Sequence, residues 1–586
     1  MQKRQFEIVA QDPSVRRNGK VLTAKINLPW EDLDAGPMGY AVYVVDYDAS
    51  AATMYQPAVL DSNIEAVEAP STLTELRENS TYHAMNVYAI VMRTLLRFEF
   101  ALGRRVGWGI RGHQLKVVPH AFEEANAFYS PDLEALLFGY VLRRQPVFLC
   151  LSHDIIAHET AHALLDGLRD KFMAPSSQDQ AALHEAFADI VALLSVFSLS
   201  EVVENLLTPI EDDDAPDGFV HKSKLSWERL KDTALLGLAE DMRADAAEAR
   251  VNALRRSVDI EPKRNILEHL EFGEEHRRGE VLVAGVMRAF LFAWVDRIKD
   301  LGDPRSANSL VGLKRVAEEG ADIAEVLLTM AIRGIDYTPP IHITFGDFLS
   351  AMLTADSEVR ADDSRYKLRT HLLTQMAAYG IEPSSGSDDG RWNPPGMKLI
   401  REGSHLGGLQ TDPTEMFRHI WNNRGPELLN VNTDAFNRVA SVRPCVRVSP
   451  DDGFQIRETV VEWVQYLNVT ADKLTEYGLR RPRSMPLDVE VPLEAGSTLI
   501  LDEYGELKYN IRNGLPSRNS SRKALQRWQE RISYLWEGGY LGGPNRSASL
   551  ASFHLRRVLE PALASDEAEA AIRREAEQRR AKESWR

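Results

Sequence analysis

The chain has 586 residues, of which 44% are hydrophobic and 26% charged, and a formal net charge of −17. This length exceeds one ordinary hydrophobic core, so we expect two to four domains in a globular protein. The acidic balance argues against a general nucleic-acid binder, which needs clustered Lys and Arg. With only Cys150 and Cys445 present, the sequence excludes a disulfide framework and, by the same count, any cysteine-based zinc site.

The first twenty residues carry basic side chains but no apolar core of a signal peptide. The chain also lacks the run of roughly 18 apolar residues that a membrane-spanning helix requires. We therefore expect a cytoplasmic protein that binds neither a membrane nor nucleic acid.

Alternating apolar and polar residues predict several strands in the first part of the chain. These are residues 6–10, 21–28, 40–47, 114–120, 126–130 and 146–151. Among them, residues 81–104 have apolar side chains at helical spacing and predict a long helix, whose Met and aromatic stripe we assign to the core. A strand-rich region, residues 1–152, thus precedes the most specific motif of the chain.

The segment His158-Glu159-Thr160-Ala161-His162 is an H-E-x-x-H motif on a predicted helix. Residues four apart lie on one face of a helix, so both imidazoles reach the same point, where a zinc ion would bind. Glu159 projects off that face, towards the open coordination position. It is placed to take a proton from the water that zinc activates.

A second predicted helix offers the third ligand that a catalytic zinc usually takes. Its apolar stripe consists of Leu183, Phe187, Ile190, Val191 and Leu194. Glu185 and Asp189 are four apart on this helix, so one carboxylate can bind the metal while the other orients a histidine ligand. The alternative, a chance H-E-x-x-H on a polar helix face, is disfavoured by this paired acidic helix.

Further helices are predicted downstream. They cover residues 223–260, residues 276–294 and residues 305–380, the last interrupted at residues 336–340. The segment His276-Arg277-Arg278-Gly279-Glu280-Val281 opens the second of these. Residues 153–380 therefore form a helical region.

Residues 381–396 have the composition of a linker, rich in Pro, Gly, Ser and Asp. The remainder, residues 397–586, is predicted to be a mixed α/β C-terminal extension. Residues 498–501 and 507–511 indicate a hairpin across the turn at 502–505. Residues 565–586 form a charged helix, either solvated or a surface for a protein partner.

Three segments together resemble the thermolysin-like zinc peptidases, the gluzincins. The first is Asn126-Ala127-Phe128-Tyr129 with Leu137-Phe138-Gly139, which is similar to the family's N-A-F-W…Y-G. The second is Ser152 to Glu159, which is similar to S-x-D-V-V-A-H-E. The third is His184 to Asp189, which is similar to N-E-x-x-S-D. The resemblance implies an α+β fold of two lobes, with the zinc helix at the junction of a strand-rich half and a helical half. It also implies that the zinc ligands are His158, His162 and Glu185, with Asp189 behind a ligating histidine.

The resemblance assigns further roles. Asn126 and Ala127 match an edge strand that binds the substrate backbone, the alternative being an ordinary edge strand. His276 matches the H-x-x-G-E-V-W of the fungalysin branch, in which the histidine donates a hydrogen bond to the oxyanion; without the resemblance it would be a helix-entry histidine. Arg255, in Ala253 to Ser257, matches an arginine that contacts the substrate carbonyl, although a surface ion pair would explain it equally.

Family members often hold calcium near the site, and residues 211–217 offer the oxygen ligands that Ca²⁺ prefers. A solvated acidic loop is the favoured interpretation of this stretch. Three departures from the family are visible: the interval from His162 to Glu185 is longer than in thermolysin, it contains no tyrosine, and position 184 is His instead of Asn.

The sequence thus predicts a zinc metallopeptidase that acts on a protein or peptide substrate. An endopeptidase is favoured because the amine-anchoring G-x-M-E-N segment of the aminopeptidase branch is absent. Two alternatives stay open. One is a regulatory or binding protein that retains a zinc site, and the other is a peptidase dedicated to one partner that the C-terminal extension recruits.

Overall fold

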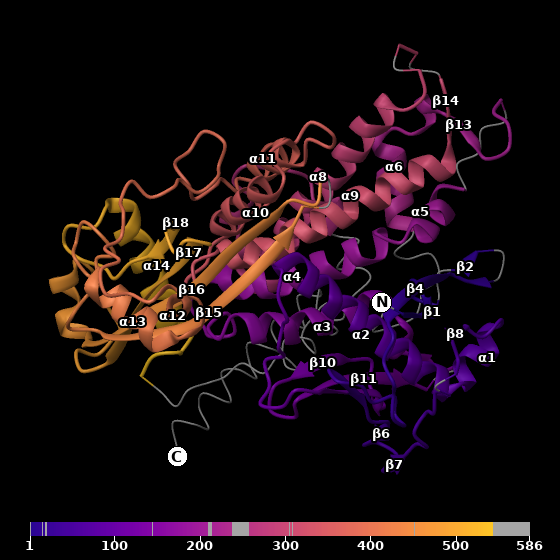
Figure 1. Ribbon diagram of the computed structural model, residues 1–586, viewed down its shortest axis with the longest axis horizontal. Helices are drawn as coiled ribbons and strands as arrows, with labels where there is room; N and C mark the ends of the chain where they lie inside the picture. Colours follow the sequence, from indigo (N-terminus) through magenta and orange to yellow (C-terminus); the bar gives the residue numbers. More distant parts are fainter. Residues whose placement is uncertain are drawn as a thin grey trace.

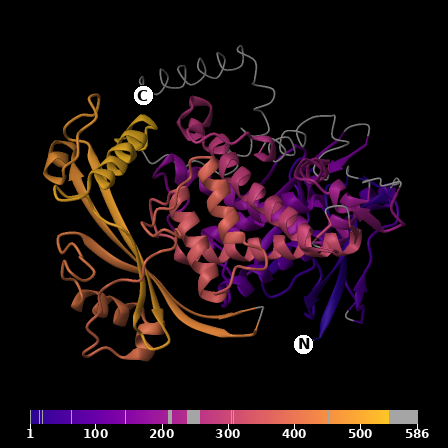
Figure 2. The ribbon, with the colours of Figure 1, turned by 90° about the horizontal axis from the view of Figure 1, so that it is seen from above.

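The computed structural model describes residues 2–13, 16–17, 20–61, 63–142, 145–208, 214–236, 257–303, 305–306, 309–449 and 452–542. Helices and strands are mixed, as expected of an α+β protein. Three regions follow one another in space: N-terminal strands, a central group of helices, and a long C-terminal sheet (Figure 1). Seen from above, the sheet and the N-terminal strands lie on opposite sides of the helices (Figure 2).

The N-terminal region contains two main sheets and one long helix. Their elements are β1 (Lys3–Val9), β4 (Thr23–Pro29) and β8 (Ala66–Val67) in the first sheet; β5 (Val42–Val44), β9 (Leu115–Phe122), β10 (Ala127–Ser130), β11 (Ala135–Val141) and β12 (Val147–Phe148) in the second; and α2 (Ser80–Leu102). Short pieces complete it: β2 (Arg16–Arg17), β3 (Lys20–Val21), β6 (Tyr47–Asp48), β7 (Thr53–Met54) and α1 (Leu73–Glu78). The second sheet has the order β10-β11-β9-β5, so β10 forms its edge.

Most of the strands predicted here are confirmed, as is the long helix, which is α2. Two predictions are too long. Of residues 40–47, only Val42–Val44 joins the main sheet, because Tyr47–Asp48 pairs separately with Thr53–Met54. Of residues 146–151, only Val147–Phe148 is a strand, and Leu149–Leu151 (η1) forms a 3₁₀ turn that leads into the next helix.

The central region is helical. It comprises α3 (His153–Leu168), α4 (Gln178–Phe197), α5 (Ser200–Leu207), α6 (Trp227–Leu236), α8 (Glu275–Asp300), α9 (Leu313–Gly334), α10 (Phe345–Val359) and α11 (Leu368–Ala378). Short 3₁₀ turns connect them: η2 (Lys222–Lys224), η3 (Ile266–Glu268), η4 (Leu270–Gly273) and η5 (Ile335–Tyr337). Two short strands, β13 (Phe219–His221) and β14 (Leu310–Gly312), pair antiparallel. Helix α4 is the central one and packs against α3, α8 and α9. Its length and apolar composition would allow it to cross a membrane, but 94% of that window is buried inside the protein, as in the core helix of a bundle.

The C-terminal region is built on an antiparallel meander. Its elements are α12 (Leu406–Thr411), α13 (Pro413–Asn422), β15 (Phe436–Val448), β16 (Gln455–Thr470), η6 (Ala471–Tyr477), β17 (Glu490–Asp502), β18 (Leu507–Asn513) and α14 (Arg522–Glu537). The predicted hairpin is confirmed and joins β17 to β18, with Thr498 opposite Ile511. The predicted helix at residues 565–586 lies outside the described residues.

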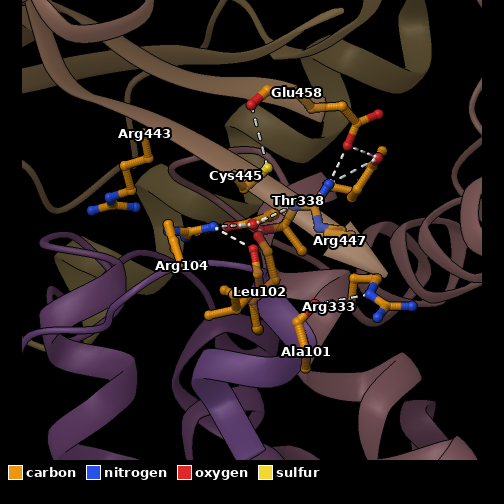
Figure 3. A network of polar contacts seen from close by, with 12 residues as sticks. Ala101, Leu102, Arg104, Arg333, Thr338, Arg443, Cys445, Arg447 and Glu458 are labelled. Carbon is orange, nitrogen blue, oxygen red and sulfur yellow. Dashed lines mark hydrogen bonds and ion pairs between the residues drawn. The ribbon is translucent and has the colours of Figure 1, made fainter. Parts of the chain in front are cut away.

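Buried charges attach this sheet to the helices. Arg104, just past the end of α2, donates to both carboxylate oxygens of Asp336 at 2.5 and 2.7 Å. Arg447 of β15 donates to Asp336 at 2.5 Å and also to Glu458 of β16. Tyr337 donates to the same Glu458 at 2.8 Å. Figure 3 shows Arg104 and Arg447 converging where strands and helices meet. The C-terminal sheet is therefore part of the same core structure and not a loosely tethered unit.

Gly103 lets the strand approach this closely. It caps α2 in the left-handed conformation, with φ of 68°, and its carbonyl accepts a 2.9 Å hydrogen bond from the Val446 backbone N–H. A Cβ at this position would collide with the Val446 carbonyl. A side chain here would thus be strained by its backbone conformation and by its neighbour.

We expect Asp336→Asn to destabilise the protein by about 3–5 kcal/mol, because it leaves two buried guanidinium groups facing each other. Asp389→Asn is the matched control, since Asp389 pairs with Arg391 and both side chains are 47% exposed; it should cost roughly 0–1 kcal/mol. Urea unfolding of the full chain at pH 7 measures both. Equal midpoints for the two variants would contradict the role given to Asp336.

The loss of unfolding free energy caused by Asp336→Asn depends on pH. Burial would raise the pKa of Asp336, but the charges of Arg104 and Arg447 outweigh it and hold that pKa well below its usual range. A depressed carboxyl pKa stabilises the folded state above the unfolded-state value of about 3.9. The difference in unfolding free energy between wild type and Asp336→Asn should therefore persist at neutral pH and shrink as the pH falls below about 4.

Candidate metal centre

The H-E-x-x-H motif lies in the middle of α3, which follows directly on the η1 turn. Helix α3 contacts η1, α2 and β10 on its strand side and α4 on its helical side. The side chains of His158, Glu159 and His162 are at most 1% exposed. The motif thus lies at the boundary between the strands and the helices, fully enclosed by both.

Helix α4 brings two carboxylates to this motif. The Nε2 atoms of His158 and His162 are 2.9 Å apart, and the Glu185 carboxylate lies 3.6 Å from each of them. Zinc binds nitrogen and carboxylate oxygen at about 2.0–2.2 Å, so two ligand atoms on one ion are separated by roughly 3–4 Å. These three buried residues could therefore hold one metal ion.

The hydrogen bonds behind the two histidines point to the same conclusion. Nδ1 of His158 lies 2.8 Å from the Asp189 carboxylate. Because a carboxylate accepts, Nδ1 carries the proton and Nε2 presents a lone pair to the other ring. Nδ1 of His162 lies 2.9 Å from Nδ1 of His184, with ring planes 6° apart. When His162 donates to His184, both Nε2 lone pairs face each other, and a cation between them satisfies both.

His184 makes a contact with His162 that sequence reasoning missed. Burial lowers its pKa to about 4, so it is neutral at pH 7 and can accept from His162. The sequence showed only that the family's Asn is replaced here. The signal that could have revealed the role is its place directly before Glu185, because neighbours of a ligand often orient the other ligands.

Glu159 is anchored to the edge strand. One of its carboxylate oxygens accepts a 3.1 Å hydrogen bond from the backbone N–H of Tyr129, in β10. The predicted edge strand is confirmed, since among the described strands β10 pairs only with β11, placing Ala127 opposite Phe138. Asn126 precedes it, and its buried amide oxygen accepts no hydrogen bond from any described residue.

His276 lies in the first turn of α8, is 5% exposed, and has its Nδ1 2.6 Å from Glu274. Burial would raise the pKa of Glu274, but the hydrogen bond from His276 lowers it to about 2. This turn packs against α4: Arg278 donates to Asp179 at 2.6 Å, and a Cβ at Gly279 would lie 2.9 Å from the Ala182 carbonyl. His276 is therefore carried by a turn that contacts α4 within one turn of Glu185.

Two sequence predictions fall on residues outside the described part of the chain. Arg255 is one, and Glu211 to Asp213 of the acidic stretch are the other. The described acidic residues of that stretch, Asp214 and Asp217, are exposed. The metal-binding groups found among the described residues contain neither.

One sequence conclusion excludes more than the cysteine count allows. Cys150 lies with His83 and His120 in a second buried group that could hold a metal ion. Two cysteines exclude a site built on several thiolates, but a mixed site needs only one, with histidines that packing brings from elsewhere. No sequence spacing could have shown this, because the three residues belong to different elements.

No protein-family model matches the chain, and no curated protein matches it.

Exchanging Asp189 for Asn should weaken the affinity of the α3–α4 centre for Zn²⁺ by roughly 10–100-fold, because a neutral amide replaces the carboxylate that orients His158 and makes its Nε2 a stronger ligand. Competition of purified protein with a chromophoric chelator measures the affinity. Asp179→Asn is the control: it lies on the same helix but pairs with Arg278, so zinc affinity should stay at the wild-type value. Wild-type affinity in Asp189→Asn would show that this contact does not support the ligand.

Proposed function

We propose that this protein is a zinc metalloendopeptidase of the thermolysin-like type, with the α3–α4 centre as its active site. The observation that carries the proposal is the convergence of His158, His162 and Glu185 in one buried group, together with the buried carboxylate of Glu159 on the same helix as the two histidines. His158, His162 and Glu185 would hold a zinc ion, which would supply polarisation of the scissile carbonyl and an activated water. A site that served structure alone would have no need of the acidic residue Glu159 next to a histidine ligand on the same helix turn.

Glu159 acts as general base in this proposal. It accepts the proton of the attacking water and returns it to the leaving amine. The hydrogen bond from Tyr129 supports this role, because it holds the carboxylate in place and ties the base to the strand that aligns the substrate. One hydrogen bond thereby joins the proposed general base to the strand that binds the substrate.

The substrate binds as an added strand beside β10. An edge strand has unpaired backbone groups that an extended peptide can pair with, and Ala127 is the first residue of this edge. The buried amide oxygen of Asn126 supports the proposal: leaving such an acceptor unsatisfied costs about 1–3 kcal/mol, which a substrate N–H would relieve.

His276 donates to the oxyanion that forms when the carbonyl is attacked. Its support is the burial of the ring, its anchoring by Glu274, and the packing of its helix turn on α4. Glu274 accepts from Nδ1, which fixes the ring orientation. Arg255, matched by the resemblance alone, is proposed to assist.

A second candidate is a peptidase dedicated to one protein partner, which the C-terminal region selects. A cavity of about 1330 Å³ lies between the starts of α4 and α8 and the C-terminal sheet with α14; its lining includes Asp179, Arg278, Gln465, Arg512 and Trp528. Tyr534 of α14 also donates to Glu275, the residue before His276, at 2.6 Å. The C-terminal region thus contacts the helix that carries the proposed oxyanion donor.

Glu159→Gln should retain its metal but cleave a loosely folded protein at least roughly 10²-fold more slowly, since glutamine accepts from Tyr129 but cannot take a proton. Cleavage assays and metal analysis of the same preparation test this. Glu201→Gln, an exposed change on α5, serves as control and should leave both readouts unaltered. Undiminished cleavage by Glu159→Gln would remove this residue from the mechanism.

The same pair of proteins separates the two candidates. Mapping of new chain ends in a cell lysate, with Glu159→Gln as background, shows whether wild type cuts many proteins or one. Many cut sites favour the general endopeptidase, and a single target with no cleavage of the loosely folded protein favours the dedicated one.

For His276→Ala, which removes the donor, we expect turnover to fall by roughly 10²–10³-fold, as for other lost oxyanion donors, while metal content and KM stay close to wild type. His269→Ala, at an exposed position just before the helix, is the matched control and should behave as wild type. Steady-state kinetics with metal analysis distinguishes the outcomes: loss of metal in His276→Ala would assign this residue to the metal site instead.

A further inference from the structure

A second group of metal-binding side chains lies on the strand side of α3. It consists of His83 on α2, His120 on β9 and Cys150 in the η1 turn, each at most 3% exposed. Their donor atoms all lie within 4.8 Å of one another. Nδ1 of His83 is 2.8 Å from Nε2 of His120, and the Cys150 sulfur is 4.0 Å from that Nε2.

Each histidine of this group is held from behind by an acceptor. Nε2 of His83 lies 2.6 Å from the carbonyl oxygen of Leu76, and Nδ1 of His120 lies 2.9 Å from both oxygens of Asp46. Since a carbonyl and a carboxylate only accept, each ring directs its N–H outward. The two remaining nitrogens then face each other with lone pairs. Metal-binding histidines show this same arrangement, with the distal N–H on a carboxylate or a backbone carbonyl.

A proton could also bridge the two rings, with a charged His120 donating to His83 and paired to Asp46. That arrangement gives the sulfur no function, whereas a metal ion uses all three donors. The charges also balance: one divalent ion, the Cys150 thiolate and the Asp46 carboxylate sum to zero, which suits a site without solvent.

The surroundings favour a structural ion over a catalytic one. The ring of Phe148 lies 5.0 Å from that of His83 and 5.1 Å from that of His120, and Tyr55 covers His120 at 5.3 Å. These aromatic walls separate the group from water. The backbone carbonyl of Cys150 further accepts from Asn86 of α2 at 3.2 Å, so α2 already holds the turn from which α3 starts.

We propose that His83, His120 and Cys150 bind a second, structural Zn²⁺ ion. The ion joins α2 and β9 to the η1 turn, and thereby fixes the start of the helix that carries H-E-x-x-H. Imidazole and thiolate donors suit Zn²⁺. This proposal is independent of the peptidase function, because it rests on residues outside the α3–α4 centre.

Cobalt substitution tests the proposal on the full chain. Metal-free protein is titrated with Co²⁺ and followed in the near ultraviolet, where a thiolate-to-cobalt charge-transfer band reports a Co–S bond. The α3–α4 centre contains no sulfur, so the band reports only the second site. We expect the band in wild type and a zinc content of two ions per chain after reconstitution with Zn²⁺.

Cys150→Ser should lose the band and one of the two zinc ions. The matched control is Cys445→Ser, which changes the other buried cysteine, a residue whose sulfur donates to the Glu458 carbonyl at 3.4 Å; it should keep the band and both ions. His158→Ala should lose one ion and keep the band. Absence of the band in wild type would overturn the proposal and favour the proton between the rings, and that result needs no variant to fold.

Discussion

Two buried imidazoles that direct lone pairs at each other require a positive charge between them. In α3 the spacing of His158 and His162 creates this requirement, and Asp189 and His184 maintain it by engaging the far nitrogen of each ring. Because both rings are buried, water cannot relieve the repulsion. The position of α4 follows from the same requirement, since that helix supplies the Glu185 carboxylate and both groups behind the histidines.

The group formed by His83, His120 and Cys150 repeats this arrangement on the other side of η1. In both groups each ring uses one nitrogen for an outward hydrogen bond. The rings of the first group lie on α3 itself, and those of the second lie on α2 and β9. The start and the middle of the H-E-x-x-H helix are thus held by polar groups of the same kind. A rigid helix is what a general base needs, because its carboxylate must stay within hydrogen-bonding distance of the reacting water.

Buried charge also explains how the C-terminal region is attached. The carboxylate of Asp336 accepts hydrogen bonds from Arg104, just past the end of α2, and from Arg447 of β15. Arg447 also donates to Glu458 of β16. Each charge compensates another, so removal of any part leaves the remainder unpaired in a medium of low polarity. The sheet is therefore coupled to the helices that build the candidate metal centre, and Tyr534 of α14 donates a hydrogen bond to Glu275 in the first turn of α8.

The sequence by itself determined the features that lie within one element. H-E-x-x-H and the Glu185–Asp189 pair could be predicted because helical periodicity fixes which side chains share a face. The strands β1, β4, β9 and β10 could be predicted because alternating residues point to opposite faces of a sheet. Tertiary structure alone decided the rest. It placed His184 behind His162, the Tyr129 N–H on Glu159, and Cys150 beside His83 and His120. These contacts join residues from separate elements, and their distances depend on how the elements pack, which no local spacing encodes.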